Sequence, residues 1–335
     1  MRILLTGSSG YIGTKLIPHL KALGHTVVGV DRDPGSSDQL DAFIHGDLVD
    51  PRVAQAAVKD VEVVMHLAAA KGDWGISEAE YYRDNLEATE VLLKAGRAAG
   101  VRDWFFYSTV STMGPSEVAI DESAPFAPAI PYGASKAEAE KLFRRAAAED
   151  PDMRVMVLRP SVVFGAGNPP NTNIYRLIDA IERGRFLMIG RGREIKTTSY
   201  IDNLIAAHLF LMERMAPGVQ TYIYVDEPPL STGDTVRLLY RFLGKQQPRL
   251  YLPLAIAKPI ASVSDVAASV FRVDLPITAA RIEKFCTGTN FDGSAIRRLG
   301  FRQPVDIEEA LRATVEWHLN DAAAVPAAEN VVGMG

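Results

Sequence analysis

Apolar residues in the first half of the chain fall in short continuous runs that alternate with longer segments of helical periodicity. The runs predict strands at 3–6, 26–30, 42–44, 61–67, 104–108 and 154–158. The segments between them predict helices at 11–22, 51–58, 81–99 and 135–148. Continuously apolar strands are buried on both faces, so this alternation predicts a doubly wound α/β fold, a parallel sheet covered by helices on both sides. Such sheets bind ligands at the carboxyl ends of their strands.

The alternation ends after Gly165, where a loop rich in Gly, Asn and Pro begins. Helices at about 173–183 and 199–212 and a strand at 221–225 follow, and the chain beyond is mixed and broken by prolines. We therefore expect a Rossmann domain of residues 1–165 plus about 200–228. Residues 166–199 plus 229–320 would form a smaller mixed α/β substrate-binding domain, and 321–335 a flexible tail.

Composition narrows the function. The chain has 335 residues, 47% hydrophobic and 23% charged, with a net charge of −5, which excludes a disordered protein and argues against nucleic acid as a partner. The single cysteine and scattered histidines show no zinc-binding spacing, so we expect no metal. The N-terminal apolar run is too short for a signal peptide, and we predict a cytoplasmic protein without a transmembrane segment.

A glycine-spaced turn, TGSSGYIG at residues 6–13, joins the first predicted strand to the first helix. Gly7 permits the tight turn, Gly10 lets a diphosphate approach the backbone, and Gly13 lets the helix pack on the strand. The helix N-terminus at Tyr11 and Ile12 offers free N–H groups and positive potential to that diphosphate. Its place between strand and helix favours a dinucleotide site over an ordinary glycine-rich turn.

Asp31 closes the second strand, 18 residues after Gly13, where a carboxylate accepts hydrogen bonds from both adenosine ribose hydroxyls. A carboxylate there repels a 2′-phosphate, so we predict NAD rather than NADP as cofactor. Arg32 points the other way, because an arginine beside the ribose can hold that phosphate, but we interpret it as a solvated loop charge. Asp47 and Leu48 follow the third strand and are placed to meet the adenine, although Asp47 could instead only begin a turn.

Tyr132 and Lys136 lie four residues apart at the start of a predicted helix. Residues at this spacing share a helix face, so both side chains can reach one pocket. Ser108 and Thr109 end the preceding strand at its carboxyl end. The alternative is a surface Tyr–Lys pair and a strand-end turn, which the neighbouring nucleotide site makes the weaker interpretation.

Together these features resemble the extended branch of the short-chain dehydrogenase/reductase superfamily, the NAD-dependent epimerase/dehydratase family. The resemblance covers nearly the whole chain, and its markers are TGSSGYIG, Asp31, GDL at 46–48, HLAA at 66–69, Asn85, Ser108-Thr109, YGASK at 132–136, LRPSVVFGAG at 158–167 and SYIDN at 199–203. The glycine motif or the Tyr–Lys pair alone would be a weak signal. Their combination in this order is a strong one.

The resemblance implies that Tyr132, Thr109 and Lys136 are catalytic. Tyr132 would be the general base, Thr109 would orient the reacting oxygen, and Lys136 would hold the nicotinamide ribose and lower the pKa of the phenol. A free tyrosine has a pKa of ~10, so a phenolate near pH 7 needs roughly 4 kcal/mol of differential stabilisation. The other cofactor contacts that the resemblance implies are Leu67, Ala68, Ala69, Asn85, Pro160 and Val162.

The loop after the fifth strand restricts the reaction. The family's dehydratases carry Thr-Asp-Glu where this chain has Thr109-Val110-Ser111, and its decarboxylases keep a Glu at the position of Ser111. Without those carboxyls, elimination and decarboxylation lose their acid/base groups. We therefore predict an NAD-dependent 4-epimerase of a nucleotide- or polyprenyl-diphosphate-linked sugar. An NAD-dependent alcohol or sterol-type dehydrogenase and a non-catalytic NAD-binding protein are the alternatives.

The substrate leaves weaker marks. Val162 stands where many nucleotide-sugar epimerases have a diphosphate-binding Asn, and residues 173–204 resemble epimerases of nucleotide- or polyprenyl-linked sugars. The substrate candidates are Asn173, Arg193 and Arg281, with solvated surface charges as the alternative for the arginines. The apolar stretch 251–273 predicts buried helices or, alternatively, a wall for a lipid chain in peripheral contact with a membrane.

Relatives pair the helices at 81–99 and 135–148, so we expect a homodimer.

Overall fold

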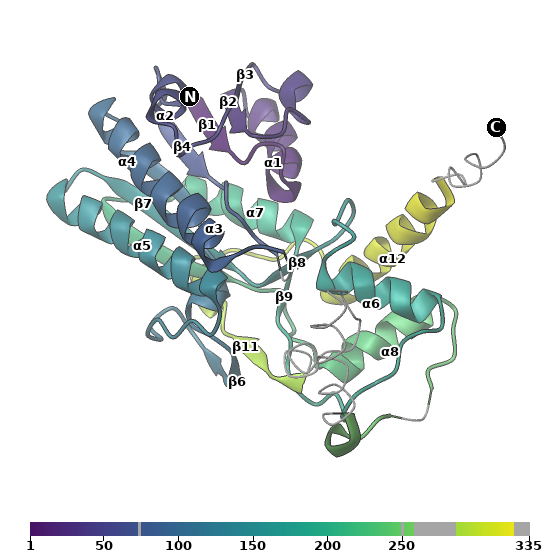
Figure 1. Cartoon of the computed structure of the whole chain (residues 1–335). Coiled ribbons are helices and arrows are strands. Elements are labelled where there is room, and N and C mark those ends of the chain that lie inside the picture. The colour runs from purple at the N-terminus through teal and green to yellow at the C-terminus, as the bar shows by residue number, and fades with distance from the viewer. Residues whose placement is uncertain (73–74, 249–250, 258–285, 325–335) are drawn as a thin grey trace. The chain divides into compact units, whose positions relative to one another are not determined.

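The computed structural model describes residues 1–72, 75–248, 251–257 and 286–324 (Figure 1). Backbone contacts divide the chain into two units. The first contains Met1–Val163, Thr197–Glu227 and Asn290–Pro304, and the second contains Phe164–Lys196, Pro228–Thr289 and Val305–Gly335. This division differs from the sequence-based one at residues 290–304, which lie in the first unit because their strand pairs with a strand of that unit.

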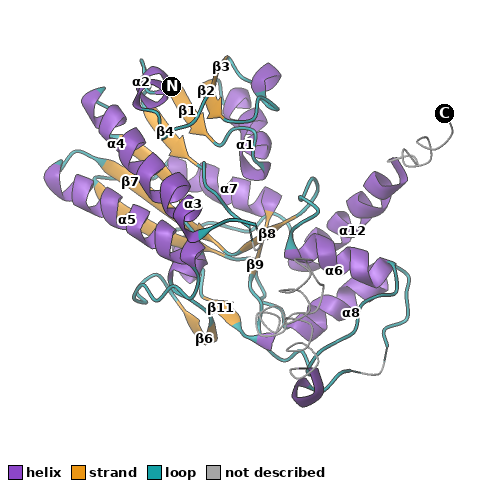
Figure 2. Ribbon diagram, in the orientation of Figure 1, coloured by secondary structure: helices purple, strands orange, loops and turns teal. Residues whose placement is uncertain are grey.

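A parallel sheet forms the centre of the first unit (Figure 2). In the described residues it has seven strands in the order β10-β7-β5-β4-β1-β2-β3, all paired in parallel. The strands are β1 (Arg2–Thr6), β2 (Thr26–Asp31), β3 (Ala42–His45), β4 (Val63–His66), β5 (Asp103–Tyr107), β7 (Arg154–Pro160) and β10 (Gly218–Tyr224). The doubly wound fold is confirmed, and the 221–225 run does rejoin the main sheet, at its edge.

Helices cover both faces of this sheet. They are α1 (Tyr11–Ala22), α2 (Pro51–Ala57), α3 (Glu78–Tyr82), α4 (Ala88–Ala98), α5 (Pro131–Glu149) and α7 (Ile201–Met212). Contacts join α1 to α7 on one side, and α4 to both α2 and α5 on the other. Asp50 caps α2 by accepting a hydrogen bond from the Arg52 N–H, with Pro51 in the first position, as the sequence predicts.

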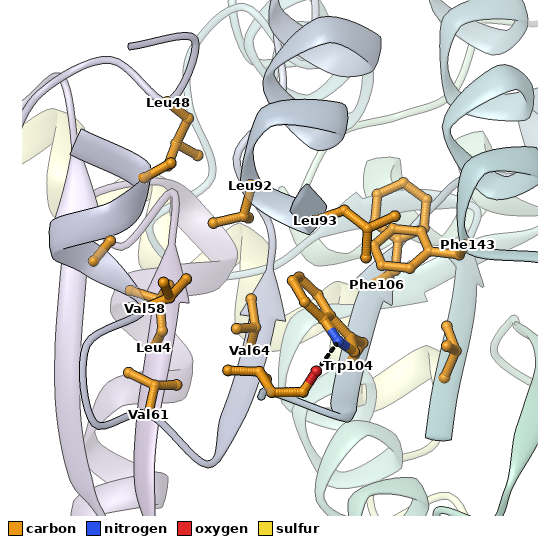
Figure 3. Close-up of a cluster of buried hydrophobic side chains, with 14 of the residues drawn as sticks. Leu4, Leu48, Val58, Val61, Val64, Leu92, Leu93, Trp104, Phe106 and Phe143 are labelled. Carbon is orange, nitrogen blue, oxygen red and sulfur yellow. Dashed lines mark hydrogen bonds between the residues drawn. The ribbon is translucent and has the colours of Figure 1, made fainter. Parts of the chain in front are cut away.

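Aromatic residues of β5 anchor the core on the α4 and α5 side (Figure 3). Trp104 and Phe106 are fully buried, and both pack against Phe143 of α5, with ring centroids 5.6 and 4.8 Å apart. A Cβ on Gly96 of α4 would lie 2.5 Å from the Trp104 ring, so only glycine allows this approach. The close packing sets β5, which leads to Thr109, against α5, which carries Tyr132 and Lys136.

Three elements differ from the sequence-based prediction. The segment 81–99 is not one α-helix, because a π-helical turn, Arg83–Glu87, separates α3 from α4. The expected helix at 199–212 begins only at Ile201, since β9 (Thr198–Tyr200) precedes it and pairs with β8 (Val162–Phe164). A two-stranded sheet of β6 (Ser116–Ile120) and β11 (Thr289–Phe291), followed by the short helix α11 (Ser294–Arg298), was not predicted. The strands β8, β9 and β11 have only three residues each, and the five residues of β6 are largely exposed, so it shows no apolar run.

The second unit contains α6 (Asn173–Glu182), α8 (Thr232–Phe242) and α12 (Ile307–Ala324). An ion pair between Arg241 and Glu308 joins α8 to α12, and His318 of α12 lies 3.0 Å from a Glu182 oxygen of α6. The helix α12 continues past Asp321, the point at which a flexible tail was expected, and residues 325–335 lie outside the described residues.

The apolar stretch 251–273 is described only as far as Ala257. In this part Leu252 and Leu254 pack with the buried Ala257 and with Ile189. The remainder, 258–273, lies outside the described residues, so the two interpretations of this stretch stay predictions. In the described part of the chain, no helix is both long and apolar enough to span a membrane.

Candidate functional site

The turn between β1 and α1 has the shape that a diphosphate needs. Gly7 has a left-handed φ of +67°, and a Cβ there would lie 2.7 Å from the Ala68 nitrogen. A Cβ on Gly13 would lie 2.4 Å from the Gly7 oxygen, so this glycine lets the helix pack closely on the turn. Gly10 is the N-cap of α1, and no side chain caps the first turn, at Tyr11 and Ile12. The positive end of the helix is thus open to an anion.

Asp31 lies beside this turn at the end of β2. Its carboxylate accepts the Ser9 N–H at 2.9 Å and the Asp33 N–H at 3.0 Å, which fixes it next to the glycine-rich segment. Arg32 is a largely exposed loop residue, and its guanidinium also donates to Asp84 at 2.9 Å. Asp47 lies at the end of β3, and the Leu48 side chain is buried in the core cluster.

His66 ends β4 and belongs to a buried hydrogen-bond chain. Thr6 Oγ1 accepts the N–H groups of residues 67–68 at 3.2 and 3.1 Å, so its own hydrogen is directed to His66 Nδ1, 2.7 Å away. Thr89 donates to the Asn85 carbonyl at 2.6 Å and therefore accepts from His66 Nε2 at 2.9 Å. The ring is the neutral Nε2–H tautomer, and burial, with a smaller effect of the Lys136 charge, lowers its pKa to about 3. His66 is a packed strand residue, as the sequence indicated.

Asn85 lies in the π turn and is fully buried. Its amide accepts the Ala70 N–H at 2.7 Å and donates to the Ala70 carbonyl at 3.1 Å. The same amide donates to Ser135 Oγ at 3.0 Å, and that hydroxyl donates to the Tyr132 carbonyl at 2.9 Å. One side chain thus ties the half-exposed loop at 67–70 to the first turn of α5.

Tyr132 and Thr109 meet at the carboxyl edge of the sheet. Thr109 caps a short turn, Val110–Thr112, and its Oγ1 accepts the Ser111 N–H at 3.1 Å. Burial raises the pKa of Tyr132 to about 12, while a hydrogen bond with Thr109 acts in the opposite direction. The Tyr81 ring lies 6.0 Å from the Tyr132 ring, and its hydroxyl donates to the Gly72 carbonyl at 2.5 Å. The phenol therefore needs nearby positive charge to ionise near neutral pH.

Lys136 is one turn further along α5 and is 1% exposed. Its ammonium lies 4.1 Å from the centre of the Phe106 ring. Burial lowers its pKa to about 7, although the charge of Glu140, one turn on, acts in the opposite direction. Tyr132 and Lys136 thus share one helix face, as their spacing predicts.

A buried charge cluster supports this helix face, and the sequence analysis did not find it. Arg159 of β7 donates to both oxygens of Glu140, at 2.8 and 2.7 Å, and Ser108 donates to the same carboxylate at 2.5 Å. Glu140 and Arg159 are 0% and 2% exposed. The i, i+4 spacing of Lys136 and Glu140 was the available signal, but only the fold brings Arg159 to the same place.

The other predicted residues are distributed over both units. Pro160 is buried at the end of β7, and Val162 is half-buried in β8. Asn173 and Arg193 are exposed residues of the second unit, and Arg281 lies outside the described residues. Their roles toward a substrate stay predictions.

A second buried carboxylate, Asp226, was also missed. It accepts hydrogen bonds from the Tyr200 N–H at 2.5 Å, the Tyr224 hydroxyl at 2.9 Å and the Asn203 amide at 3.0 Å. Burial outweighs these hydrogen bonds and raises the pKa of Asp226 to about 6. It holds the SYIDN segment against the end of β10.

The described residues also include one group with metal-ligand chemistry, in the second unit. Ligand atoms of Asp179, Glu182 and His318 lie within 4.8 Å of one another. All three side chains already have a partner, because His318 Nε2 lies 3.0 Å from a Glu182 oxygen and Arg183 donates to Asp179 at 2.7 Å.

Comparison with known proteins identifies the fold and its relatives. Residues 3–225 match the model of the NAD dependent epimerase/dehydratase family. The chain is 28% identical to N-acetyl-alpha-D-glucosaminyl-diphospho-ditrans,octacis-undecaprenol 4-epimerase of Escherichia coli O157:H7, over 94% of each chain. It is 30% identical to 2-alkyl-3-oxoalkanoate reductase of Stenotrophomonas maltophilia, over 93% of this chain and 98% of the relative.

Among solved structures, MoeE5 in complex with UDP-glucose and NAD superimposes with a TM-score of 0.77. The match has 26% sequence identity and covers 96% of this chain and 100% of the other. The similarity therefore extends over both units and is not confined to the parallel sheet.

Proposed function

The chain belongs to the NAD-dependent epimerase/dehydratase family, and we propose that it is a sugar 4-epimerase in which Tyr132 is the single acid/base group. The observation that carries this proposal is the arrangement around the phenol. Thr109 lies close enough to the phenol to lower its pKa, Lys136 is one helical turn away, and the loop that follows Thr109 has Val110 and Ser111 where elimination would need carboxylates.

NAD is the cofactor of this enzyme, and the residues present fit it. The uncapped N-terminus of α1 would receive the diphosphate. Asp31 would accept the adenosine ribose hydroxyls. The half-exposed backbone at residues 67–69 would line the path toward Lys136, which we propose holds the nicotinamide ribose.

The proposed reaction uses the chain's residues as follows. Thr109 holds the reacting hydroxyl oxygen of the sugar by a hydrogen bond. Tyr132, as a phenolate, takes the hydroxyl proton and later returns it to the same oxygen. NAD, when bound, would take the hydride of the reacting carbon and return it to the opposite face, which would invert that carbon.

The buried charges explain how the phenol ionises. With a pKa of about 12, Tyr132 is protonated at neutral pH unless positive charge lies nearby. We propose Lys136, one helical turn along α5, as that cation, and its own pKa of about 7 means that it, too, would gain from a neighbouring anion. A Tyr132 phenolate and a Lys136 ammonium therefore stabilise each other in the low-polarity site.

For the substrate we propose a sugar diphosphate, with a nucleotide or a polyprenyl chain as the carrier. The relatives named above support both carriers, because one acts on a polyprenyl-linked sugar and another binds UDP-glucose. We further propose that Asn173, Arg193 and Arg281 contact it. We also propose that the protein is a homodimer and that it is cytoplasmic. If its substrate is lipid-linked, it would contact the membrane surface peripherally.

The test is an epimerisation assay on paired UDP-linked and polyprenyl-diphosphate-linked sugars, with product detected by chromatography. We expect turnover without net NADH, and at least a ~100-fold loss in Tyr132→Phe with NAD still bound. Tyr222→Phe, a half-buried tyrosine of β10, is the matched control and should keep activity. Normal turnover in Tyr132→Phe would refute the role of the phenol, and the faster of the two substrates identifies the carrier.

A second candidate is an NAD-dependent reductase or dehydrogenase, which the similarity to 2-alkyl-3-oxoalkanoate reductase favours. It would use the same Tyr132, Thr109 and Lys136, but would release reduced cofactor after each turnover. Stoichiometric NADH build-up during alcohol oxidation supports this candidate. Retention of NAD through many turnovers supports the epimerase.

A further inference from the structure

Four side chains of alternating charge contact one another beside Asp31, the residue predicted to bind the adenosine ribose. Arg32 follows β2, Asp47 follows β3, and Arg83 and Asp84 lie in the π turn. We call these four residues the charge ring. Arg83 donates to Asp47 at 2.6 Å and to Asp84 at 2.5 Å, and Arg32 donates to Asp84 at 2.9 Å and lies 3.9 Å from Asp47.

The ring is held in place by its neighbours. The Arg32 carbonyl lies 2.9 Å from His45 Nε2, and an Asp47 oxygen accepts the Val49 N–H at 3.2 Å. Partial burial alone would raise the pKa of Asp47, but hydrogen bonds from Arg83 and Val49 lower it overall. The Asp84 carboxylate is 12% exposed. Asp84 lies within ion-pair distance of both guanidinium groups.

The charges decide what the ring can bind. Two arginines and two aspartates sum to zero, and Asp31 immediately before Arg32 makes the total −1. A 2′-phosphate on the adenosine would bring ~2 further negative charges. To bind it bidentately, Arg32 would first have to lose its bond to Asp84. A lone arginine at this position favours NADP, whereas one hydrogen-bonded to Asp84 with Asp47 3.9 Å away does not.

We propose that Asp47 and Asp84 are specificity-determining residues, which exclude NADP by occupying the guanidinium of Arg32. Asp31 repels the 2′-phosphate directly, and the two ring acids remove the cation that would otherwise compensate. The chain thus has an arginine that could bind a 2′-phosphate directly after an aspartate that would repel one. In this proposal the charge of Arg32 is balanced by Asp84 of the π turn.

The experiment is a competition measured on the purified holoenzyme. Each variant is equilibrated with an equimolar excess of NAD and NADP and desalted, and the bound cofactors are released by acid and quantified by mass. The readout is the bound NADP-to-NAD ratio, so any adenine contact that both cofactors share cancels. Protein that binds neither cofactor is excluded by its lack of released nucleotide.

We expect Asp31→Ser to raise the ratio, and Asp84→Asn in that background to raise it by up to about fivefold more, because Arg32 is released from an exposed ion pair. Adding Asp47→Asn should raise it again, and Arg32→Ala should cancel both gains. Asp152→Asn is the matched control, since it removes an acid from an exposed pair with Arg102 at the start of β5, away from the cofactor edge. Asp84→Ser is a second variant should Asp84→Asn fold poorly. An unchanged ratio in the Asp84 variants, or a gain that survives Arg32→Ala, would overturn the proposal.

Discussion

Two groups of charges in the first unit have opposite surroundings. In the charge ring the arginine side chains are 56% and 43% exposed, whereas under the catalytic helix Glu140 and Arg159 are almost completely excluded from water. Exposed ion pairs contribute ~0–1 kcal/mol each, so the ring can be altered without unfolding the protein. Removing one partner from a buried pair leaves an unpaired charge in a medium of low polarity. We therefore expect substitutions in the charge ring to change cofactor selectivity without unfolding the protein. Substitutions in the Glu140–Arg159 pair should disturb the helix that carries Tyr132 and Lys136.

The largest effect should follow from breaking the buried pair. Glu140→Gln leaves Arg159 without its counter-charge and should lower the free energy of unfolding by about 3–5 kcal/mol, as measured by urea denaturation. Replacing both partners, as in Glu140→Leu with Arg159→Met, should recover most of this loss because neither charge of the pair is left without its partner. A loss below ~1 kcal/mol in the single variant would show that water reaches the pair.

Asn85 connects the two regions, because it lies next to the ring residues in sequence and binds the catalytic helix. Asn85→Ala removes its hydrogen bonds to Ala70 and Ser135, and should cost about 1–3 kcal/mol of stability. Turnover should fall more than cofactor affinity, since Tyr132 loses a positioning contact. Asn290→Ala, a half-buried asparagine of β11, serves as the control. Unchanged turnover in Asn85→Ala would mean that α5 is positioned by the core alone.

Two buried histidines should make the free energy of unfolding depend on pH. Burial lowers the pKa of His66 and His208 to about 3, below the ~6.5 of an unfolded chain. The unfolded state therefore binds two more protons as the pH falls below ~6.5, and stability declines from there toward pH 3. At pH 5.5 each histidine should cost about 1.4 kcal/mol.

His208 gives the clearest variant for this test. Its ring lies 3.9 Å from that of Phe105, and neither of its nitrogens has a partner among the described residues. His208→Phe should remove half of the acid sensitivity and raise stability at neutral pH by roughly 1 kcal/mol. The exposed His19, changed to Gln, should leave the pH profile unchanged. A steep profile that persists in His208→Phe would assign the sensitivity elsewhere.

The smallest change in stability is expected in the ring itself. Asp84→Asn should alter the free energy of unfolding by less than ~1 kcal/mol, and added salt should reduce the difference further. Denaturation at low and high ionic strength measures both quantities. A loss comparable to that of Glu140→Gln would mean that the ring is structural and would erase the contrast between the two regions.

The sequence was sufficient for features that depend on local pattern. Alternating strands and helices, the glycine turn and the Tyr132–Lys136 helix face all follow from residues close together in the chain. Arg159 and Glu140 were not predicted to meet, because their contact depends on how α5 packs against β7. The π turn was not predicted because Leu86, Leu92 and Leu93 continue a helical pattern through it. Asn85 lies in this turn, and its contacts with Ala70 and Ser135 depend on distant parts of the chain.

The helices at 81–99 and 135–148, which were expected to form a dimer interface, also show what a sequence pattern leaves undetermined. Leu92, Leu93 and Phe143 gave these segments an apolar stripe, but the structure buries all three in the core of the same chain. Periodicity reports that a face is buried and does not report against what. The homodimer therefore stays a prediction, which sedimentation of the purified protein at micromolar concentration would test.

Because of the π turn, the segment between residues 78 and 98 needs its present number of residues to keep its side chains facing their partners. Deleting one residue there would restore a continuous α-helix, and every side chain on one side of the deletion would rotate by about 100° relative to the other. Either Asn85 would turn away from Ala70 and Ser135, or Gly96 would turn away from Trp104. A single-residue deletion in this segment should thus be more harmful than most substitutions within it, although four of its five π-helical residues are not fully buried.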